Sequence, residues 1–306
     1  MDFKQSKSFI YHNARPLDLA RWKYHFENGS KEDVLIVLST YKNKDGGFAH
    51  ALEPDSWNEN SSPLQTWVAT RLIEEIDLSD KKHLIITGIL KYLESSHEFN
   101  GHLWNGLNTV QSNNDYPHAP WWSYTKKDET QYNPSASLIG FILKYAEKHS
   151  DLYQKGIELL NEAIQYFKES IPLESMHETA CFVELYQYLK ESENEDLVNM
   201  HEFKLLLTTQ MKKLISNDID TWASNYACKP CLFIKNQASD FYQAFKDLCD
   251  QECQFIIKNQ NLDGTWNITW NWESYPKEWV ISQNWWKSDM IIKNLLFLKA
   301  MNKALF

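Results

Sequence analysis

The sequence predicts an all-α protein whose paired helices close into a ring around a central cavity. Three observations predict this fold: helical periodicity along most of the chain, turns that recur far apart, and helices of two alternating kinds. With only 9 Gly and 9 Pro in 306 residues, a β protein with many turns is disfavoured. No linker rich in Pro, Gly or Ser interrupts the chain, so we expect one domain over residues 1–306.

Two segments that lie far apart in the chain end alike. Residues 41–48 (YKNKDGGF) align with residues 259–266 (NQNLDGTW), and a looser copy lies between them at residues 100–104 (NGHLW). Each copy follows an apolar helical pattern, closes on an Asx-Gly turn and then presents an aromatic residue. The Asx residues stand at 45, 100 and 263, so the gaps are 55 and 163 residues. Stacked helix pairs of about 54 residues each would give this spacing.

Apolar periodicity places ten helices along the chain. Ser62 can cap a helix that has Pro63 in its first turn, and Asp80 can cap the next one. Pro134 and Ser135 open a third helix in the same way. The expected helices span residues 15–28, 31–42, 63–77, 81–96, 135–149, 151–170, 175–190, 196–215, 238–259 and 285–303.

These helices alternate in character. Residues 136–145 (ASLIGFILKY) and 290–301 (MIIKNLLFLKAM) are apolar on much of their circumference, as inner helices buried on two sides would be. Residues 155–170 and 195–213 carry a single apolar stripe, as outer helices would. An inner and an outer helix per unit, repeated about five or six times, forms a curved layer that can close on itself.

The charge and cysteine content of the chain limit the kinds of partner and compartment that we expect. The formal charge of -10 disfavours nucleic acids and anionic membranes, because both require basic patches. The segment Met1 to Lys7 is polar and has no apolar run behind it, so we expect neither a signal peptide nor a transmembrane segment. Five cysteines without a secretion signal are typical of a reducing cytoplasm. We therefore expect a cytoplasmic protein with a small-molecule ligand.

Aromatic residues are abundant, with 13 Trp, 15 Tyr and 15 Phe, and many of the Trp lie in loop-like stretches. Such rings could line a cavity that binds an apolar, cationic or sugar-like ligand. Alternatively, they plug the ends of a wide helical ring. The two irregular regions, residues 97–133 and 216–236, are long enough to suggest a functional role.

Residues 255–266 carry a resemblance to a known superfamily. Phe255-Ile256, Gln260 and Gly264-Thr265-Trp266 resemble the glutamine–tryptophan repeat of squalene-type cyclases, and residues 45–48 resemble its degenerate form. The chain is thus similar to the terpenoid cyclases and protein prenyltransferases, and most similar to short bacterial members with a single toroid and no assigned activity. The resemblance implies an α/α toroid, a barrel of inner and outer helices with a central cavity.

The catalytic motifs of that superfamily are incomplete in this chain. Its proton-initiated cyclases carry Asp-x-Asp-Asp, whereas residues 218–221 (DIDT) lack the last Asp and leave Asp220 as a candidate acid. The Asp-rich magnesium motif is absent, and we do not find the prenyltransferase zinc ligands. The resemblance therefore implies the fold and a hydrophobic or isoprenoid-like ligand, while the activity depends on the site residues.

The loop after the first Asp-Gly-Gly turn holds an imidazole and two carboxylates, those of His50, Glu53 and Asp55. In a toroid this loop reaches the mouth of the cavity. These groups could perform acid–base chemistry if burial raised the pKa of one carboxyl group. Alternatively, the carboxylates bind backbone N–H groups of the loop or stay solvated.

Residues 115–122 (DYPHAPWW) form the other candidate loop. Two prolines hold it extended, and it presents one imidazole and two adjacent indoles that could stack on a ligand. Alternatively, its own aromatic residues pin it over the open end of the ring. A second pair of Trp heads the last expected helix, where ordinary core packing is an equal alternative. The predicted substrate-binding residues are His50, His118, Trp121, Trp122, Tyr124, Trp285 and Trp286.

His177 and Cys181 share one face of an expected helix, since they are four residues apart. A lone histidine on a helix is more often a structural residue than a ligand. We therefore do not include this pair among the predicted site residues.

Four cysteines approach the spacing of a zinc site. Cys228 and Cys231 form one pair, and Cys249 and Cys253 form a second. The second pair is wider than usual, no glycine-rich knuckle flanks either pair, and cysteine is often buried without a metal. We predict free thiols, no metal and no cofactor, with zinc as the minor alternative.

Taken together, these features favour an enzyme that acts on a hydrophobic or isoprenoid-like molecule in the cavity. Glu53, Asp55 or Asp220 would act as the acid, and aromatic faces would stabilise positive charge. Because loops that enter inner helices gather at one rim, Glu53 and Asp55 should open onto the same cavity as the candidate indoles. The alternatives are a carbohydrate-active α/α barrel and a non-catalytic binding scaffold.

Overall fold

The structure is a computed structural model that describes residues 1–303. Within that range it contains eleven α-helices and five short 3-10 helices, and the only β-type pairing is four isolated bridges. The all-α prediction is confirmed. The α-helices are α1 (Phe3–Asn13), α2 (Pro16–Phe26), α3 (Lys31–Ser39), α4 (Pro63–Glu75), α5 (Leu84–Ser95), α6 (Ser135–Tyr145), α7 (Asp151–Ser170), α8 (Met176–Glu191), α9 (Met200–Leu214), α10 (Tyr242–Lys258) and α11 (Pro276–Ala300). The 3-10 helices are η1 (Gln111–Asp115), η2 (Pro120–Trp122), η3 (Glu195–Leu197), η4 (Ile219–Ala223) and η5 (Pro230–Leu232).

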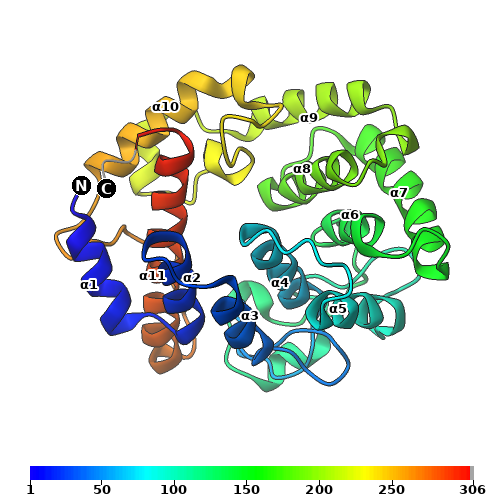
Figure 1. Cartoon of the computed structure of the whole chain (residues 1–306), viewed down its shortest axis with the longest axis horizontal. Coiled ribbons are helices and arrows are strands. Elements are labelled where there is room, and N and C mark those ends of the chain that lie inside the picture. The colour runs from blue at the N-terminus through cyan, green and yellow to red at the C-terminus, as the bar shows by residue number, and fades with distance from the viewer. Residues whose placement is uncertain (304–306) are drawn as a thin grey trace. The chain divides into compact units, whose positions relative to one another are not determined.

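Backbone contacts divide the described residues into two compact units. Unit 1 contains residues 1–40 and 214–303, and unit 2 contains residues 41–213 (Figure 1). Each unit has its own buried apolar core. The prediction of a single domain over residues 1–306 stays a prediction. None of the described helices is long and apolar enough to cross a membrane.

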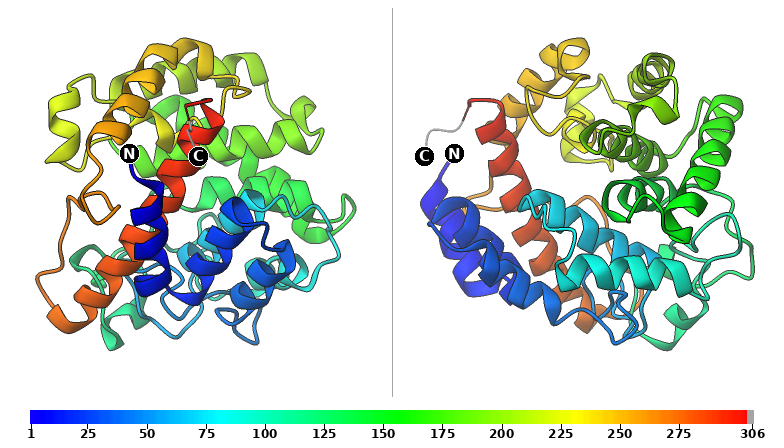
Figure 2. Two further views of the ribbon diagram at one scale, coloured as in Figure 1. Left: turned by 60° about the vertical axis from the view of Figure 1, so that its left-hand side comes forward. Right: turned by 45° about the vertical axis from the view of Figure 1, so that its right-hand side comes forward.

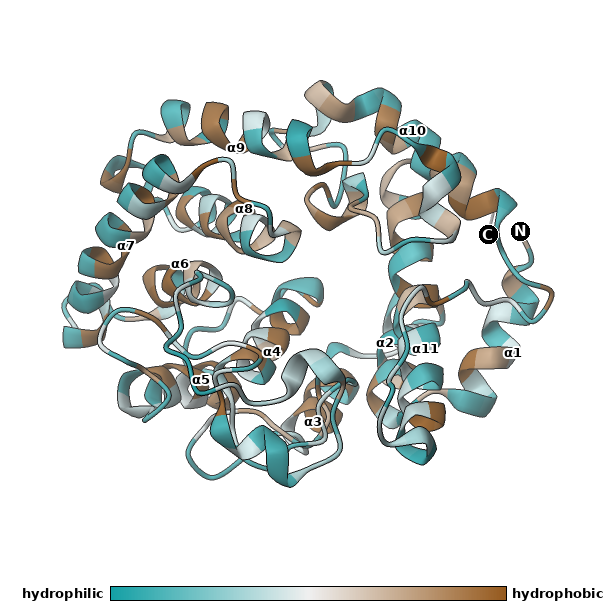
Figure 3. Ribbon diagram, turned by 180° about the vertical axis from the view of Figure 1, so that it is seen from behind, coloured by the Kyte–Doolittle hydropathy of each residue, from teal (hydrophilic) through white to brown (hydrophobic). Residues whose placement is uncertain are grey.

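Unit 2 is built around α6, which contacts α4, α5, α7 and α8 (Figure 1). Every residue of α6 except Lys144 is buried, because apolar and small side chains occupy its whole circumference. Gly140 lets the ring of Tyr188 on α8 approach closely, since a Cβ at this position would lie 2.7 Å from that ring. By contrast, α7 buries a single stripe, and Figure 3 shows its hydrophobic and hydrophilic turns alternating. The predicted contrast between these two helices is confirmed.

Unit 1 is organised around α11, which lies beside α1 and α2 in both views of Figure 2 and also contacts α10. A buried ion pair joins α2 to α11, with Arg21 Nη1 2.8 Å from Asp289 Oδ1. Arg21 also pairs with Asp18, and Asp289 pairs with Lys293 at 2.6 Å. Burial acts to raise the pKa of Asp289, but Lys293 and Arg21 outweigh it and hold that pKa well below the usual range.

Each of the ten predicted helices has a counterpart, but several ends differ. Ser62 caps α4 with Pro63 in the first turn, as predicted. Helix α5 begins only at Leu84, because Asp80 caps a tight turn before it and His83 is the N-cap. Helix α11 begins at Pro276 instead of residue 285, and α1 was not predicted.

The first predicted repeat is a tight turn with a left-handed glycine. Asn43 N–H donates to Gly47 O at 2.9 Å, and Gly46 N–H donates to Asn43 O at 3.1 Å. The Asp45 carboxylate accepts from Gly47 N–H at 3.0 Å, while Gly46 has φ 97°. A residue with a Cβ would be strained at this φ, which explains the glycine.

The turn near the end of α10 repeats this pattern bond for bond. Asn261 N–H donates to Thr265 O at 2.8 Å, and Gly264 N–H donates to Asn261 O at 2.9 Å. The Asp263 carboxylate accepts from Thr265 N–H at 3.1 Å, and Gly264 has φ 85°. The alignment of residues 41–48 with residues 259–266 is therefore also a structural equivalence.

The third copy is shorter. Asn100 N–H donates to Leu103 O at 3.0 Å, which closes a loop of four residues where the other two copies close five. Asn100 Oδ1 accepts from His102 N–H at 3.0 Å, and Gly101 has φ 103°. The Asx-Gly feature is common to all three copies, whereas the loop length is not.

Candidate functional site

The two loops that carry most of the predicted site lie together in unit 2. Residues 49–62 and 98–133 are joined by a bond from Ala119 N–H to Asp55 O at 2.9 Å. An isolated antiparallel bridge forms beside this bond. The expected proximity of the two loops is therefore present, although it is made by backbone atoms.

Within the first loop, the predicted acids are largely covered. Asp55 is 3% exposed and Glu53 is half-buried. His50 is exposed, and its Nε2 lies 2.9 Å from Asn43 Oδ1, so Nε2 carries the hydrogen because an amide oxygen only accepts. Tyr124, from the second loop, is half-buried. None of these positions forms an open pair of carboxylates.

The octapeptide at 115–122 is pinned by its own side chains. His118 is buried, with Nδ1 2.6 Å from Tyr116 O and Nε2 3.0 Å from Ser123 Oγ, so both ring nitrogens have partners. Trp122 is fully buried and offers no face to a ligand, whereas Trp121 is 37% exposed. The predicted clamp of two stacking indoles is therefore reduced to one indole, and the pinned-loop alternative is favoured.

The remaining predicted residues belong to unit 1. Asp220 is exposed on the 3-10 helix η4. The Arg15 guanidinium lies 5.8 Å from the ring centroid of Trp285, and Trp286 meets Trp270 edge to face at 5.3 Å. A common cavity for these residues and those of unit 2 stays a prediction.

A different group of side chains converges on Glu184 of α8. Glu184 Oε2 accepts from Trp67 Nε1 at 2.8 Å and from Ser137 Oγ at 2.7 Å. Glu184 Oε1 lies 3.2 Å from Arg71 Nε. The partners come from α4 and α6, so this one carboxylate joins three helices of unit 2. These contacts fix the directions of the two carboxylate oxygens, as a preorganised ligand-binding site requires.

Arg71 is positioned on two sides. Its guanidinium carbon lies 4.8 Å from the ring centroid of Trp67, and Glu184 pairs with it from α8. Trp67 and Arg71 are four residues apart on α4 and therefore share a face. The side chains of Arg71 and Glu184 remain 28% and 21% exposed, so a small molecule can reach the pair.

His177 lies on the same side of α8, two turns before Glu184, with Cys181 between them. Burial, and then the charge of Arg71, lower the pKa of His177, so its imidazole is neutral near pH 7 and can accept a proton. Cys181 is fully buried, and burial raises the pKa of its thiol well above the usual value. We therefore assign the imidazole, and not the thiol, to the site.

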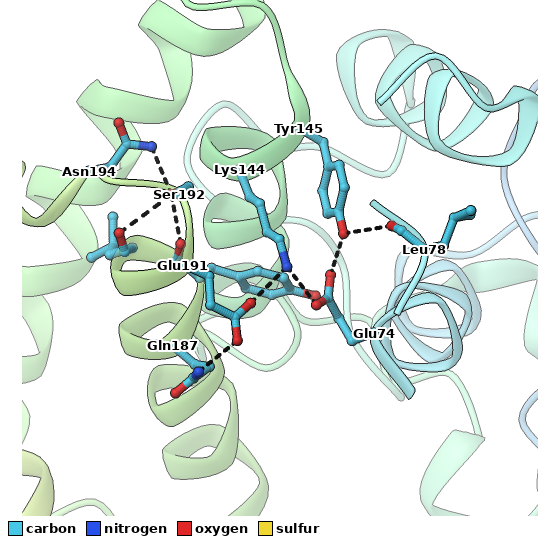
Figure 4. A network of polar contacts seen from close by, with 10 residues as sticks. Glu74, Leu78, Lys144, Tyr145, Gln187, Glu191, Ser192 and Asn194 are labelled. Carbon is cyan, nitrogen blue, oxygen red and sulfur yellow. Dashed lines mark hydrogen bonds and ion pairs between the residues drawn. The ribbon is translucent and has the colours of Figure 1, made fainter. Parts of the chain in front are cut away.

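A second polar network joins the same three helices further along (Figure 4). Lys144 Nζ lies 2.6 Å from Glu74 Oε2 and 2.7 Å from Glu191 Oε2, and Tyr145 O–H donates to Glu74 at 2.7 Å. Burial raises the pKa of Glu74, although Lys144 opposes this effect. Burial acts to lower the pKa of Lys144, but Glu74 and Glu191 raise it, so the ammonium group stays charged. Because the Lys144 ammonium is paired with carboxylates of two neighbouring helices, we interpret this network as structural.

One pattern in the sequence points to this site. Residues 67, 71 and 74 of α4, and residues 177, 181 and 184 of α8, follow the spacing of a helix face that faces other helices. Charged residues on such a face indicate pairing between helices. Which residues pair cannot be read from one helix alone.

One buried carboxyl group, that of Glu252, contributes to the raised pKa of all four cysteine thiols of unit 1. Glu252 is 1% exposed and accepts from Cys231 N–H at 2.8 Å, and the cysteines are free. Over residues 1–303, no group of three or more His, Cys, Asp or Glu side chains is arranged to hold a metal ion. Burial raises the pKa of three further thiols to about 12: those of Cys228, Cys249 and Cys253.

Comparison with known proteins identifies no relative of this chain. The chain matches no family model, and the searches of curated proteins and of solved structures returned no significant match. The resemblance to the terpenoid cyclases and prenyltransferases thus stays a prediction.

Proposed function

We propose that this chain is an α/α toroid of the terpenoid cyclase and prenyltransferase kind that binds a hydrophobic small molecule and exchanges a proton with it. The all-helical fold, the contrast between α6 and α7, and the equivalent turns at residues 43–47 and 261–265 support the architecture. The toroid would enclose the cavity that the aromatic content predicts.

One observation carries the functional part: Arg71 of α4 and Glu184 of α8 form a pair that is partly exposed, and His177, whose pKa the charge of Arg71 lowers, stands two turns before Glu184 on the same side of α8. A neutral imidazole can take a proton from a bound molecule and return it. The guanidinium, held by Glu184 and Trp67, can stabilise the negative charge that forms. In this proposal Glu184 replaces Glu53 and Asp55 as the leading carboxylate, because two donors and a guanidinium fix its oxygens.

A carbohydrate ligand is the second candidate. Beside the Trp67 ring stand an arginine, a serine hydroxyl and a carboxylate, all groups that bind sugar hydroxyls. Hydrolysis of a glycan by two carboxylates is less favoured than binding of a glycan. Glu184 is the single carboxylate among the groups described at this site. A non-catalytic scaffold would show binding without proton exchange.

Binding is tested by native mass spectrometry with two probes, the isoprenoid alcohol farnesol and the disaccharide cellobiose. We expect farnesol to be retained by the wild type, and at least fivefold more weakly by Glu184→Gln and Arg71→Gln. The matched control is Glu174→Gln, which makes the same change at an exposed residue just before α8. Retention of cellobiose alone would support the second candidate, and retention of neither probe would contradict both.

Proton exchange is tested separately in D₂O. The probe is geranylacetone, an isoprenoid ketone whose C–H groups beside the carbonyl are acidic enough to exchange. We expect carbon-bound deuterium to enter it faster with the wild type than with His177→Asn, as read from the mass of the released ketone. Binding without deuterium in either protein would support the scaffold alternative.

A further inference from the structure

Three Asn-Gly pairs occur in the chain, at residues 28–29, 100–101 and 105–106. Asparagine before glycine readily loses ammonia without an enzyme, because glycine has no Cβ to hinder the attack of its backbone nitrogen on the asparagine side chain. In that reaction the glycine N–H loses its proton, and the nitrogen bonds to the side-chain carbonyl carbon. The surroundings of each glycine nitrogen therefore decide which pair reacts in the folded chain.

Two of the pairs are protected by hydrogen bonds. Gly29 N–H donates to Lys23 O at 2.8 Å, at the end of α2. Gly106 is buried, and its N–H donates to Thr109 Oγ1 and to Glu129 Oε2, both at 2.8 Å. These bonds must open locally before either glycine nitrogen can attack.

The pair at residues 100–101 is different. Both residues are exposed, and over residues 1–303 Gly101 N–H donates to no acceptor of the chain. In the two longer copies of this turn, the N–H groups of Gly46 and Gly264 donate to the first residue of the loop. Each of those glycines is the fourth residue of its loop, whereas Gly101 is the second residue of the shorter copy and too close to its start for such a bond.

The side chain of Asn100 is also held in a way that favours the attack. Its Oδ1 accepts from His102 N–H at 3.0 Å and from Leu103 N–H at 2.8 Å. When Gly101 N adds to Asn100 Cγ, negative charge develops on this oxygen. The two N–H groups then stabilise that charge, as the donors of an oxyanion hole do.

We propose that Asn100 is a site of spontaneous deamidation, with Gly101 N as the nucleophile and water as the only other reactant. The bond from Gly101 N to Asn100 Cγ forms, the bond from Cγ to Nδ2 breaks, and ammonia leaves with the proton of Gly101. The resulting succinimide ring adds water at either of its carbonyl carbons and opens to aspartate or to isoaspartate. The site is independent of the proposed function, because the turn at residues 100–103 shares no residue with the Arg71–Glu184 site.

The two products differ in their effect on the turn. Aspartate keeps an acceptor oxygen for the N–H groups of His102 and Leu103, as the Asp45 carboxylate does for a backbone N–H in the first copy. Isoaspartate adds one methylene to the backbone before Gly101, so the bond that closes the four-residue loop is lost. The reaction thus gives one product that preserves the turn and one that opens it.

The test incubates the full chain in mildly alkaline buffer made with water enriched in oxygen-18, which labels carboxyl groups formed during the incubation. Peptide mapping by tandem mass spectrometry then gives the rate at each Asn-Gly pair. We expect Asn100 to react at least about tenfold faster than Asn28 and Asn105, a difference of about 1.4 kcal/mol in the barrier. The labelled product should be two peptides of equal mass, one with aspartate and one with isoaspartate.

Two controls separate the fold from the local sequence. In guanidinium chloride the fold is removed, and the three pairs should react at similar rates. Gly101→Ala, whose Cβ would meet nothing within 4 Å, should slow the reaction at Asn100 severalfold and leave Asn28 unchanged.

Three results would overturn the proposal. The first is a rate at Asn100 in the folded chain that is no higher than the rate at Asn28. The second is an unlabelled Asn100 after the time in which the unfolded chain is converted. The third is an unchanged rate at Asn100 in Gly101→Ala, since Gly101 N would then not be the nucleophile.

Discussion

Gly264 lies directly against the first helix, since a Cβ placed on it would be 2.2 Å from the backbone nitrogen of Ser6. The Ser6 hydroxyl donates to Gly264 O at 2.7 Å and accepts from Gln260 Nε2 at 2.9 Å. In unit 2, a Cβ on Gly46 would lie 2.1 Å from the backbone oxygen of Gly88 on α5. The repeated turn therefore has the same role twice: a left-handed glycine lets the end of one helix dock on the backbone of another.

We predict that Gly264→Ala lowers the free energy of unfolding by more than about 3 kcal/mol. Alanine at φ 85° is strained by about 1–2 kcal/mol, and its Cβ would also collide with the backbone of α1. Backbone atoms cannot move aside as a flexible side chain can. Urea unfolding followed by circular dichroism measures the loss.

Gly101→Ala is the matched control for this prediction. Gly101 has a similar φ of 103°, but a Cβ there would meet nothing within 4 Å. We expect only the backbone strain, a loss of about 1–2 kcal/mol. Equal losses for the two variants would show that the docking of the turn on α1 contributes nothing.

The helices could be predicted where the apolar pattern is strong, and not elsewhere. Helix α6 is apolar all round and α7 has a clean stripe, so both appear in the sequence. Helix α1 buries only Ser6 and Ile10, and its polar composition hides it. It forms because Asp2 caps it and the turn at residues 261–265 docks on it, which is a contact between distant parts of the chain.

The candidate site was less predictable than the fold. Glu184 stands in α8 between the apolar Val183 and Leu185, and only the packing of α4 and α6 on that helix reveals its partners. The loop at 115–122 shows the opposite problem. Its composition fits a ligand clamp and a pinned loop equally, and the burial of His118 and Trp122 decides between them. Burial of loop side chains depends on distant contacts that no local pattern encodes.

We predict that Lys144→Met destabilises the protein by about 2 kcal/mol or more. The change leaves the Glu74 and Glu191 carboxylates close together without the ammonium that both contact. Removing one partner of a largely buried pair costs more than the pair itself contributes. The double variant Lys144→Met/Glu74→Gln should recover part of this loss, because it removes one of the two charges.

Lys155→Met provides the comparison for Lys144. Lys155 pairs with Glu158, and both side chains are far more exposed than the Lys144 pair, at 42% and 67%. Exposed pairs contribute about 0–1 kcal/mol, so we expect little change in the urea midpoint. A Lys144→Met loss no larger than that of Lys155→Met would contradict the structural interpretation of the network.

We predict that Glu252 makes the protein less stable as the pH rises from about 4.5 towards 7. Burial raises the pKa of Glu252, while bonds from Cys231 and the charge of Lys229 oppose the shift without cancelling it. Between the unfolded pKa and this raised value, the folded state holds more protons than the unfolded state. Stability then falls with rising pH, by up to about 1.4 kcal/mol per unit for one proton.

Glu252→Gln should flatten this dependence, because glutamine does not titrate and its amide oxygen still accepts from Cys231 N–H. The measurement is the free energy of unfolding at pH 4.5, 5.5, 6.5 and 7. Glu273→Gln makes the same change at an exposed position of unit 1 and should leave the wild-type slope intact. An unchanged slope in Glu252→Gln would exclude this residue as the source.

We predict that Glu184 contributes its charge to the site more than to the fold. Glu184→Gln keeps an acceptor oxygen for Trp67 and Ser137 and loses only the ion pair with Arg71, which solvent partly screens. The expected loss of unfolding free energy is about 1 kcal/mol or less. Glu184→Leu removes the acceptor as well, so two donors lose their partner and the loss should rise to about 2–4 kcal/mol. Urea unfolding of the two variants side by side measures the difference.

If Glu184→Gln were as destabilising as Glu184→Leu, the carboxylate charge would be holding the three helices together. Weaker ligand binding by Glu184→Gln would then reflect a damaged fold. If the two variants differ as expected, a loss of farnesol or cellobiose binding in Glu184→Gln can be assigned to the charge at the site.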